Sequence, residues 1–218
     1  MVKGKFITFE GPEGSGKSTH IRLLAGFLKE HGYDVLLTRE PGGTPIGEAI
    51  RGLLQHNEAG EEPSARTEVL LFLASRAQHV DQLIRPALER GVWVLCDRFD
   101  DSTFAYQGFG RKFDLTELRA VNHFATQGLK PDLTLLLDVS PETSRERLQA
   151  RQSQTSTSPD RIERESDAFH VRLRKGFLDL ARQEPERFVV LTTESDRNSV
   201  AEKIRAFVIQ RLMQRERV

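Results

Sequence analysis

Residues 11–18 carry the clearest chemistry in the sequence, because their types and spacing suit the binding of phosphate groups. The segment reads Gly-Pro-Glu-Gly-Ser-Gly-Lys-Ser and matches the pattern G-x-x-x-x-G-K-[ST] at every fixed position. Glycines let the backbone curl so that its N–H groups point at phosphate oxygens, and the helix that follows adds partial positive charge. We interpret the segment as a phosphate loop for a nucleoside triphosphate with Mg²⁺. A glycine-rich turn that matches by chance is the alternative, and the strand–loop–helix context disfavours it.

Each polar residue of this loop has an expected task. Lys17 should reach the β- and γ-phosphates, and the Ser18 hydroxyl is placed to bind Mg²⁺. Glu13 is unusual, because a carboxylate among phosphate-binding amides would repel the triphosphate. We expect Glu13 to face a cation instead, with an arginine from residues 145–164 as its partner. The residues expected to bind the triphosphate are Gly11, Pro12, Glu13, Gly14, Ser15, Gly16, Lys17, Ser18 and Thr19.

A second group of candidate residues follows the apolar run at 92–96. Asp97 stands where phosphate-loop proteins place the carboxylate that manages Mg²⁺, so Ser18 and Asp97 are the expected metal ligands. Arg98 comes next, and in a crevice at the strand ends it is suited to grip a second phosphate group by paired hydrogen bonds. The alternative is a structural ion pair between Asp97 and Arg98.

Two further segments are suited to a planar base and a sugar. Phe72 and Arg76 stand four residues apart in a helical segment, which places a stacking ring and a donor to a carbonyl on one face. A core phenylalanine beside a surface arginine is the alternative. The segment from Ser102 to Gln107 offers hydroxyls, a tyrosine ring and an amide that suit a base edge and sugar. Its alternative is an ordinary helix face.

Five apolar runs must position these residues, and most are continuously apolar rather than alternating. Strands buried on both faces have that pattern, which indicates a parallel sheet covered by helices. Helix-length segments alternate with the runs, so we expect a single α/β domain over residues 1–218, doubly wound, with helices on both faces. The expected strands are 5–10, 34–38, 92–96, 132–139 and 187–192. The expected helices are 17–31, 45–55, 65–90, 114–127, 141–151, 163–183 and 196–215.

Residues 152–160, QSQTSTSPD, differ in composition from the rest of the chain. They include no apolar residue, so we expect an exposed, mobile loop. Composition alone favours a solvated loop, because acidic residues are interleaved with the arginines on both sides. The phosphate loop favours a mobile lid over about 145–164, which closes over the γ-phosphate, excludes water and supplies an arginine. The flanking arginines are Arg145, Arg147, Arg151, Arg161 and Arg164.

The overall composition limits the partners and the compartment. The chain has 218 residues and a formal net charge of zero, so it has no basic excess that would attract nucleic acid or an anionic membrane. No run approaches a membrane span, and the first residues lack the apolar region of a signal peptide. We therefore expect a cytoplasmic protein with no nucleic-acid or membrane partner. The single cysteine, Cys96, lies in an apolar run and is expected to be buried and inert.

Six motifs together make the chain resemble the bacterial thymidylate kinase family. They span most of the chain, and Thr-Arg-Glu-Pro-Gly-Gly-Thr with Ala-Tyr-Gln-Gly is close to diagnostic. The motifs are FEGPEGSGKST (9–19), TREPGGTPIGEAIR (38–51), LLFLASRAQ (70–78), DRFDDSTFAYQGFGR (97–111), PDLTLLLDV (131–139) and DRIERES (160–166). The resemblance implies a P-loop NTPase fold with five parallel strands and a homodimer. It also implies that the γ-phosphate of ATP is transferred to dTMP, giving dTDP and ADP for dTTP synthesis.

The resemblance also implies roles for the residues of the acceptor pocket. Phe72 resembles the thymine-stacking ring, and Arg76 and Gln107 resemble the readers of the base edge. Tyr106 resembles the residue that favours deoxyribose. The remaining residues that it places around dTMP are Glu40, Arg51, Arg98, Ser102 and Thr103, with Arg51 and Arg98 at the phosphate.

Transfer itself is expected to use charge rather than covalent chemistry. No basic residue precedes the lysine of the loop, so the chain resembles the class that supplies an arginine from the lid. Arg151 is the first candidate for that role and Arg147 the second. The expected catalytic residues are Glu13, Lys17, Asp97, Arg98, Arg147 and Arg151. No general base is expected, because a phosphate monoester is already largely ionised near neutral pH.

Other users of a phosphate loop are less consistent with this sequence. A guanine-specific switch would need Asn-Lys-x-Asp or Thr-Lys-x-Asp, and a transporter-type ATPase would carry Leu-Ser-Gly-Gly-Gln; these strings are absent. The rivals that stay open are another nucleotide or deoxynucleoside kinase and a switch that hydrolyses ATP slowly. The arginines suited to a second phosphate favour a monophosphate acceptor.

Overall fold

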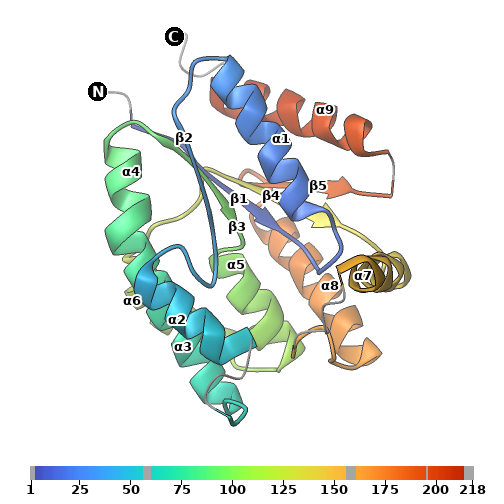
Figure 1. Cartoon of the computed structure of the whole chain (residues 1–218). Coiled ribbons are helices and arrows are strands. Elements are labelled where there is room, and N and C mark those ends of the chain that lie inside the picture. The colour runs from blue at the N-terminus through green and yellow to red at the C-terminus, as the bar shows by residue number, and fades with distance from the viewer. Residues whose placement is uncertain (1–2, 56–59, 156–160, 195, 214–218) are drawn as a thin grey trace.

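One parallel sheet forms the centre of the molecule. The computed structural model describes residues 3–55, 60–155, 161–194 and 196–213. The strands run in the order β2-β3-β1-β4-β5, and every pair of neighbours is parallel (Figure 1). They are β1 (Phe6–Glu10), β2 (Val35–Arg39), β3 (Trp93–Asp97), β4 (Leu133–Asp138) and β5 (Phe188–Thr192). Each lies within one residue of its predicted bounds, so the five-stranded parallel α/β fold is confirmed.

Helical segments connect the strands. The α-helices are α1 (Lys17–Glu30), α2 (Pro45–Gln55), α3 (Ala65–His79), α4 (Arg85–Glu89), α5 (Asp100–Thr103), α6 (Leu115–Thr126), α7 (Pro141–Thr155), α8 (Asp167–Gln183) and α9 (Arg197–Val208). Three π-helical segments are η1 (Val80–Ile84), η2 (Phe104–Gly110) and η3 (Ile209–Met213). The predicted helix at 65–90 is therefore one continuous run in which η1 separates α3 from α4.

Helices cover both faces of the sheet, as the continuous apolar runs predict. Successive side chains of a strand point to opposite faces. Ile7 and Phe9 of the central strand pack against α1 and α9, which lie side by side (Figure 1). Phe6 packs on the other face with η1 and α4, and Leu136 of β4 joins the cluster formed by α3, η2 and α8. Side chains are buried on both faces of the central strands β1, β3 and β4, which holds their carboxyl ends in a fixed relation.

Two helical boundaries differ from the sequence prediction. Residues 152–155 were expected in a loop but form the last turn of α7, so that part of the prediction is wrong. The Ser153 hydroxyl lies 3.0 Å from the carbonyl oxygens of both Gln149 and Ala150, so its hydrogen-bonding capacity is satisfied within the helix. Residues 156–160 lie outside the described residues. The predicted helix at 163–183 begins four residues later, after Ser166 accepts a hydrogen bond from the Phe169 amide as its N-cap.

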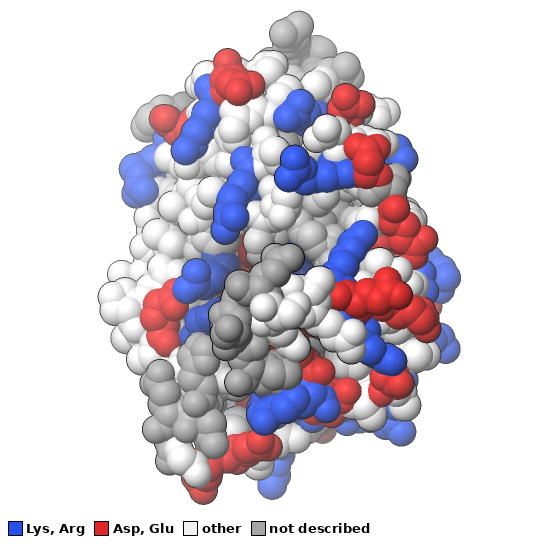
Figure 2. All heavy atoms as spheres, turned by 45° about the vertical axis from the view of Figure 1, so that its right-hand side comes forward, with Lys and Arg blue, Asp and Glu red and all other residues white. Residues whose placement is uncertain are grey.

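The charged side chains on the surface reflect the net charge of zero. On the face shown in Figure 2, acidic and basic side chains alternate without a broad area of one sign. No helix within the described ranges combines the length and apolarity that crossing a bilayer requires. Cys96 is fully buried in β3, and burial raises the pKa of its thiol well above the ordinary value. The prediction of a buried thiol is confirmed, and the raised pKa keeps it in its unreactive protonated form.

Candidate functional site

The phosphate loop lies where β1 ends and α1 begins. Gly11 has φ 132°, and a Cβ there would come within 2.3 Å of the Leu137 carbonyl oxygen, so only glycine fits. Lys17 is folded onto its own loop: its Nζ donates to the carbonyls of Gly11 at 3.0 Å and Pro12 at 2.8 Å. Burial, with Arg98 nearby, lowers the pKa of Lys17 to about 8. The loop therefore has a buried cation that its own carbonyls hold.

Two oxygen ligands for a cation meet at the edge of the same loop. The Ser18 hydroxyl donates to Oδ2 of Asp97 at 3.0 Å, which joins the start of α1 to the end of β3. Hydroxyl and carboxylate oxygens are the ligands that Mg²⁺ prefers, and Mg²⁺ usually keeps several waters beside them. Among the described residues, no group of three or more His, Cys, Asp or Glu side chains is placed to hold a metal. The pair therefore fits Mg²⁺ that also binds phosphate oxygens.

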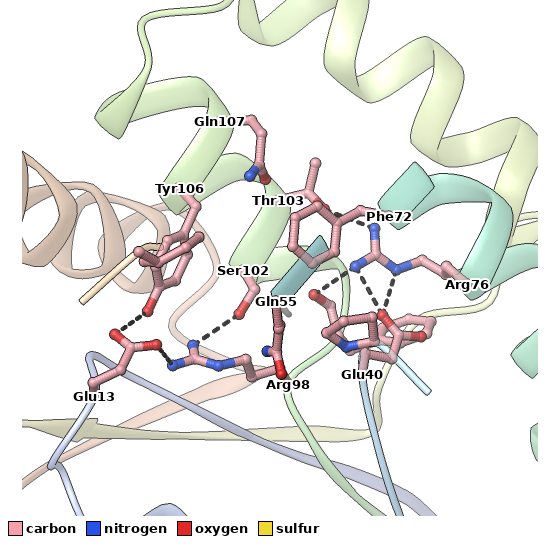
Figure 3. Close-up of a pocket in the computed structure, with 13 residues that line it drawn as sticks. Glu13, Glu40, Gln55, Phe72, Arg76, Arg98, Ser102, Thr103, Tyr106 and Gln107 are labelled. Carbon is pink, nitrogen blue, oxygen red and sulfur yellow. Dashed lines mark hydrogen bonds and ion pairs between the residues drawn. The ribbon is translucent and has the colours of Figure 1, made fainter. Parts of the chain in front are cut away.

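Glu13 has a different partner from the one expected. Arg98 donates to Glu13 Oε1 at 2.6 Å, and the Tyr106 hydroxyl donates to Oε2 at 2.7 Å (Figure 3). Burial opposes ionisation of this carboxyl, but Arg98 and Lys17 outweigh it, so its pKa lies below the ordinary value. The prediction that Glu13 faces a cation is confirmed, whereas the prediction of a lid arginine as partner is wrong. Arg98 directly follows β3, and its side chain turns toward the phosphate loop. It therefore pairs with Glu13 and not with Asp97, which was the alternative.

A wide basin lies in front of the phosphate loop. It has a volume of about 550 Å³, and its walls include Lys17, Ser18, Thr19 and Asp97. Arg51 and Arg151 line it as well, so two of the expected arginines reach the same space. Sequence reasoning missed Arg39 and Gln55, which also line the basin. Arg39 stands at the carboxyl end of β2 beside Glu40, and that position was the available signal.

A narrower slot adjoins the basin. Phe72, Arg76, Thr103 and Gln107 line it, and four residues border both hollows. The shared residues are Glu13, Glu40, Gln55 and Arg98. In Figure 3 Phe72 and Tyr106 lie on different sides of the opening, with Arg98 below them. The structure therefore brings every expected acceptor-pocket residue to this slot except Arg51, which lies in the basin.

Arg76 is the most heavily bonded residue of the slot. Its side chain is 1% exposed, which excludes the alternative of a surface arginine beside a core phenylalanine. It donates to Glu40 and Thr103 at 2.8 Å, to Asn122 at 2.9 Å and to the Phe99 carbonyl at 3.0 Å. These bonds tie α3 to the segments that follow β2 and β3, and to α6. Hydrogen bonding of Arg76 to a base stays a prediction, whereas its hydrogen bonds between the walls of the slot are observed.

Glu68 is a residue of this site that sequence reasoning missed. The carboxylate is fully buried and accepts from Gln107 at 2.7 Å and from Arg111 at 2.8 and 2.9 Å. It also accepts from Arg161, which lies in the expected lid region. The signal was its spacing: Glu68, Phe72 and Arg76 stand four residues apart in turn, on one face of α3.

The segment from Phe104 to Gly110 forms π-helical turns rather than a regular helix. Tyr106 and Gln107 are adjacent in sequence, yet Tyr106 bonds Glu13 of the phosphate loop and Gln107 bonds Glu68 of α3. Single π-helical turns are frequent at functional sites. An ordinary helix face was only the alternative interpretation of this segment, because the aromatic residues and glycines of FAYQGFG are not spaced with helical periodicity.

The two lid arginines have different surroundings. Arg147 donates to the Gly14 carbonyl at 3.2 Å and to the Thr193 carbonyl at 2.6 Å, so it braces the outside of the phosphate loop. Arg151, one turn later on α7, faces the basin and pairs with Glu163. The central lid residues 156–160 lie outside the described residues.

Comparison with known proteins gives consistent results. The family model described as "Thymidylate kinase" matches residues 9–204. The thymidylate kinase of an Exiguobacterium species is 47% identical over 213 residues, which cover 98% of each chain. That of Carboxydothermus hydrogenoformans is 48% identical over 95% of this chain and 98% of its own. The crystal structure of thymidylate kinase from Ehrlichia chaffeensis superposes with a TM-score of 0.76 at 34% identity, covering 94% of this chain and 99% of that one.

Proposed function

The chain belongs to the thymidylate kinase family, and from this premise we propose how its residues divide the work of phosphoryl transfer. It is a nucleoside monophosphate kinase that transfers the γ-phosphate of ATP to dTMP, giving dTDP and ADP. The observation that supports the division of roles is the meeting of basin and slot at Glu13 and Arg98. A donor in one hollow and an acceptor in the other would have their reacting groups beside Arg98.

The donor side uses residues 11–19 and the strand end. Lys17 releases the loop carbonyls and donates instead to oxygens of the β- and γ-phosphates. The negative charge of these oxygens favours the protonated form of the amine. Ser18 and Asp97 would hold Mg²⁺, which when bound neutralises charge on the β- and γ-phosphates. This role for the pair is supported by their 3.0 Å contact and by the oxygen chemistry of both groups.

The acceptor side uses the slot. Phe72 stacks its ring on thymine. Arg76 and Gln107 lie at the base edge, where their N–H groups are shared between their present protein partners and the base. Tyr106 packs beside the sugar and limits room for a 2′-hydroxyl. Arg98 binds the acceptor phosphate, with Arg51 on the basin side and Glu40, Ser102 and Thr103 completing the wall.

Transfer needs positioning and charge stabilisation rather than a base. An oxygen of the acceptor phosphate is ionised near neutral pH and attacks the γ-phosphorus in line. Arg151 is the candidate for the arginine that stabilises charge on the transferring group, because its side chain lines the basin. Arg147 is less suited, because the Gly14 and Thr193 carbonyls occupy its guanidinium.

A homodimer is part of the same proposal. Three apolar side chains are exposed on α3 and α6, which pack together: Leu70 is 62% exposed, Val121 40% and Phe124 86%. Ile46 on the adjacent α2 is 55% exposed. We name these four residues the α2–α3–α6 face and assign a second copy of the chain to it, since a copy would remove this apolar surface from water. A cytoplasmic location is proposed with it, in keeping with the buried reduced thiol of Cys96.

An acceptor panel tests the division of roles. Product formation from ATP and Mg²⁺ would be measured with dTMP, dUMP, UMP, CMP, AMP and thymidine. We expect strong preference for dTMP, and loss of that preference in Phe72→Ala with ATP affinity unchanged. Preference for thymidine would contradict Arg98 as a phosphate ligand, because thymidine offers no phosphate. Equal use of dTMP and UMP would contradict the role of Tyr106.

A further inference from the structure

Glu10, the last residue of β1, is a buried carboxylate to which the proposed roles assign no task. Its side chain is fully buried directly before the phosphate loop. The Phe99 amide donates to Glu10 Oε1 at 2.7 Å, and the Ser102 hydroxyl donates to Oε2 at 2.6 Å. Both partners belong to the turn that leaves β3 and enters α5. One carboxylate therefore clamps the turn at two points, on either side of Asp100 and Asp101.

That turn contains the most unusual backbone of the site. Arg98 has φ 70°, in the left-handed region that residues with a side chain seldom occupy. Its amide donates to the Phe9 carbonyl, and its own carbonyl accepts from the Cys96 thiol at 3.0 Å. Such a conformation persists when surrounding bonds hold it. The Glu10 bond to the next amide in the chain, that of Phe99, is one of those bonds.

The Ser102 hydroxyl links Glu10 to the guanidinium of Arg98. A hydroxyl has one hydrogen, and here that hydrogen goes to Glu10. The lone pairs of Ser102 then face outward, and Arg98 donates to them at 3.2 Å. The same Arg98 nitrogen donates to the Gly11 carbonyl at 3.0 Å, next to Glu10 in the chain. Backbone and side chain of Arg98 are thus both fixed from Glu10.

We infer that Glu10 is a positioning residue for phosphoryl transfer: it holds Arg98 in the left-handed turn and orients Ser102 so that the guanidinium faces the acceptor phosphate. The inference rests on the proposed role of Arg98 as ligand of that phosphate. Glu10 itself touches neither substrate, because its side chain is closed off behind the loop. Its loss should weaken acceptor use and leave donor binding intact.

The surroundings of Glu10 show why a neutral substitute is tolerable in the fold. Burial, with Asp101 nearby, raises the pKa of Glu10 to about 8, whereas the hydrogen bonds from Ser102 and Phe99 favour the ionised form that accepts them. Other charged groups whose fields reach Glu10 are Arg98 and Lys17. Glu10→Gln keeps the shape and one acceptor oxygen for the Phe99 amide. It replaces the acceptor toward Ser102 by an NH₂ donor, so the hydroxyl must reorient.

The experiment compares Glu10→Gln, Ser102→Ala, Arg98→Ala and the double variant Glu10→Gln/Ser102→Ala. Asp132→Asn is the matched control, because Asp132 accepts the Phe6 amide at 2.7 Å at the opposite end of β1. KM and kcat would be measured for dTMP at saturating ATP and for ATP at saturating dTMP, with thermal unfolding of every variant. We expect Glu10→Gln to lower kcat/KM for dTMP about 5- to 20-fold and leave KM for ATP within about twofold. The control should match the wild type in both.

The outcomes separate the inference from the proposed role on which it depends. Support requires Ser102→Ala to lose kcat/KM for dTMP as well, and the double variant to lose less than the product of the two single effects. If Arg98→Ala impairs dTMP use but Glu10→Gln behaves like Asp132→Asn, the inference is overturned and the role of Arg98 stands. If Arg98→Ala leaves dTMP use intact, both fall. If Glu10→Gln does not fold, an unchanged kcat/KM for dTMP in Ser102→Ala is enough to overturn the inference that Glu10 acts through Ser102.

Discussion

Tyr106 donates a 2.7 Å hydrogen bond to Glu13, and so a residue of the acceptor slot is bonded directly to the donor loop. The ring of Tyr106 also lies against Arg98, with the guanidinium carbon 5.0 Å from the ring centroid. Glu13, Arg98 and Tyr106 therefore form one partly buried unit. A change in any of the three alters the boundary between the two substrates.

Tyr106→Phe tests that unit. The variant keeps the ring and removes the hydroxyl, so Glu13 loses a buried donor, a loss of about 1–3 kcal/mol. We expect kcat/KM for dTMP to fall about 5- to 100-fold, with the larger share in KM. Tyr33→Phe is the control, because Tyr33 is the other tyrosine of the chain and packs on Trp93 away from the site. An unchanged KM for dTMP in Tyr106→Phe would show that the bond does not shape the slot.

The pH dependence of donor binding should report Lys17. Its pKa of about 8 in the free protein means that the amine loses its proton as pH rises past that value. ATP needs the charged form, so binding above pH 8 requires proton uptake, and kcat/KM for ATP should fall by up to about tenfold per pH unit. Lys17→Arg, whose guanidinium stays charged, should lack this fall although it is slower. A wild-type profile that is flat to pH 9.5 would contradict the lowered pKa.

Arg151→Ala should lower kcat more than it raises KM for dTMP, because the proposed contact strengthens in the transition state. A loss of about 10²- to 10³-fold in kcat is in the range of a removed charge at a transferring phosphate. Arg145→Ala is the control on the same helix, since Arg145 pairs with Asp167 at the surface. Single-turnover rates with both nucleotides saturating give the comparison. A change confined to dTMP affinity would move the role away from Arg151.

Stability should depend on pH through Glu10. Its folded pKa of about 8 lies above its ordinary value of 4.5, so between these values the folded state binds a proton that the unfolded state has lost. The free energy of unfolding should therefore fall as pH rises from about 4.5 to 8 and level off above. Glu10→Gln should reduce this slope and leave the share of Asp100, whose pKa burial raises to about 7, whereas Asp132→Asn should retain the whole slope. Urea unfolding at pH 5, 6, 7 and 8 measures the difference.

The α2–α3–α6 face predicts the oligomeric state. The chain has a mass of 24.8 kDa, so light scattering should give about twice that value for the wild type. Phe124→Asp places a charge at the most exposed apolar side chain and should yield the monomer mass. Val171→Asp, at a 57% exposed apolar position on α8, should remain a dimer. A monomeric wild type at micromolar concentration would contradict the assignment of a second copy of the chain to this face.

The fold was predictable because the signals that specify it are local. Five apolar runs and the loop at 11–18 gave every strand within one residue, since strands buried on both faces read as continuous apolar segments. The meeting of Ser18 and Asp97 agrees with their prediction as metal ligands, because the phosphate loop follows β1 and Asp97 ends the adjacent parallel strand β3. The partner of Glu13 was not predicted, because nothing local says that Arg98 turns toward the loop through a left-handed φ. Glu68 and Glu10 were missed because buried acids look like surface acids until their partners are in place.

Glu68 joins the acceptor slot to the expected lid region through Arg161. The same buried carboxylate accepts from Gln107, which lines the slot, and from Arg161, which follows residues 156–160. Because both donors share one carboxylate, we expect a ligand that changes the bond between Gln107 and Glu68 to change the bond between Glu68 and Arg161 as well. Linkage makes that effect reciprocal, so any fixing of Arg161 by dTMP returns as an equal gain in dTMP affinity. Occupancy of the slot and the position of Arg161 in the lid region are then two coupled equilibria.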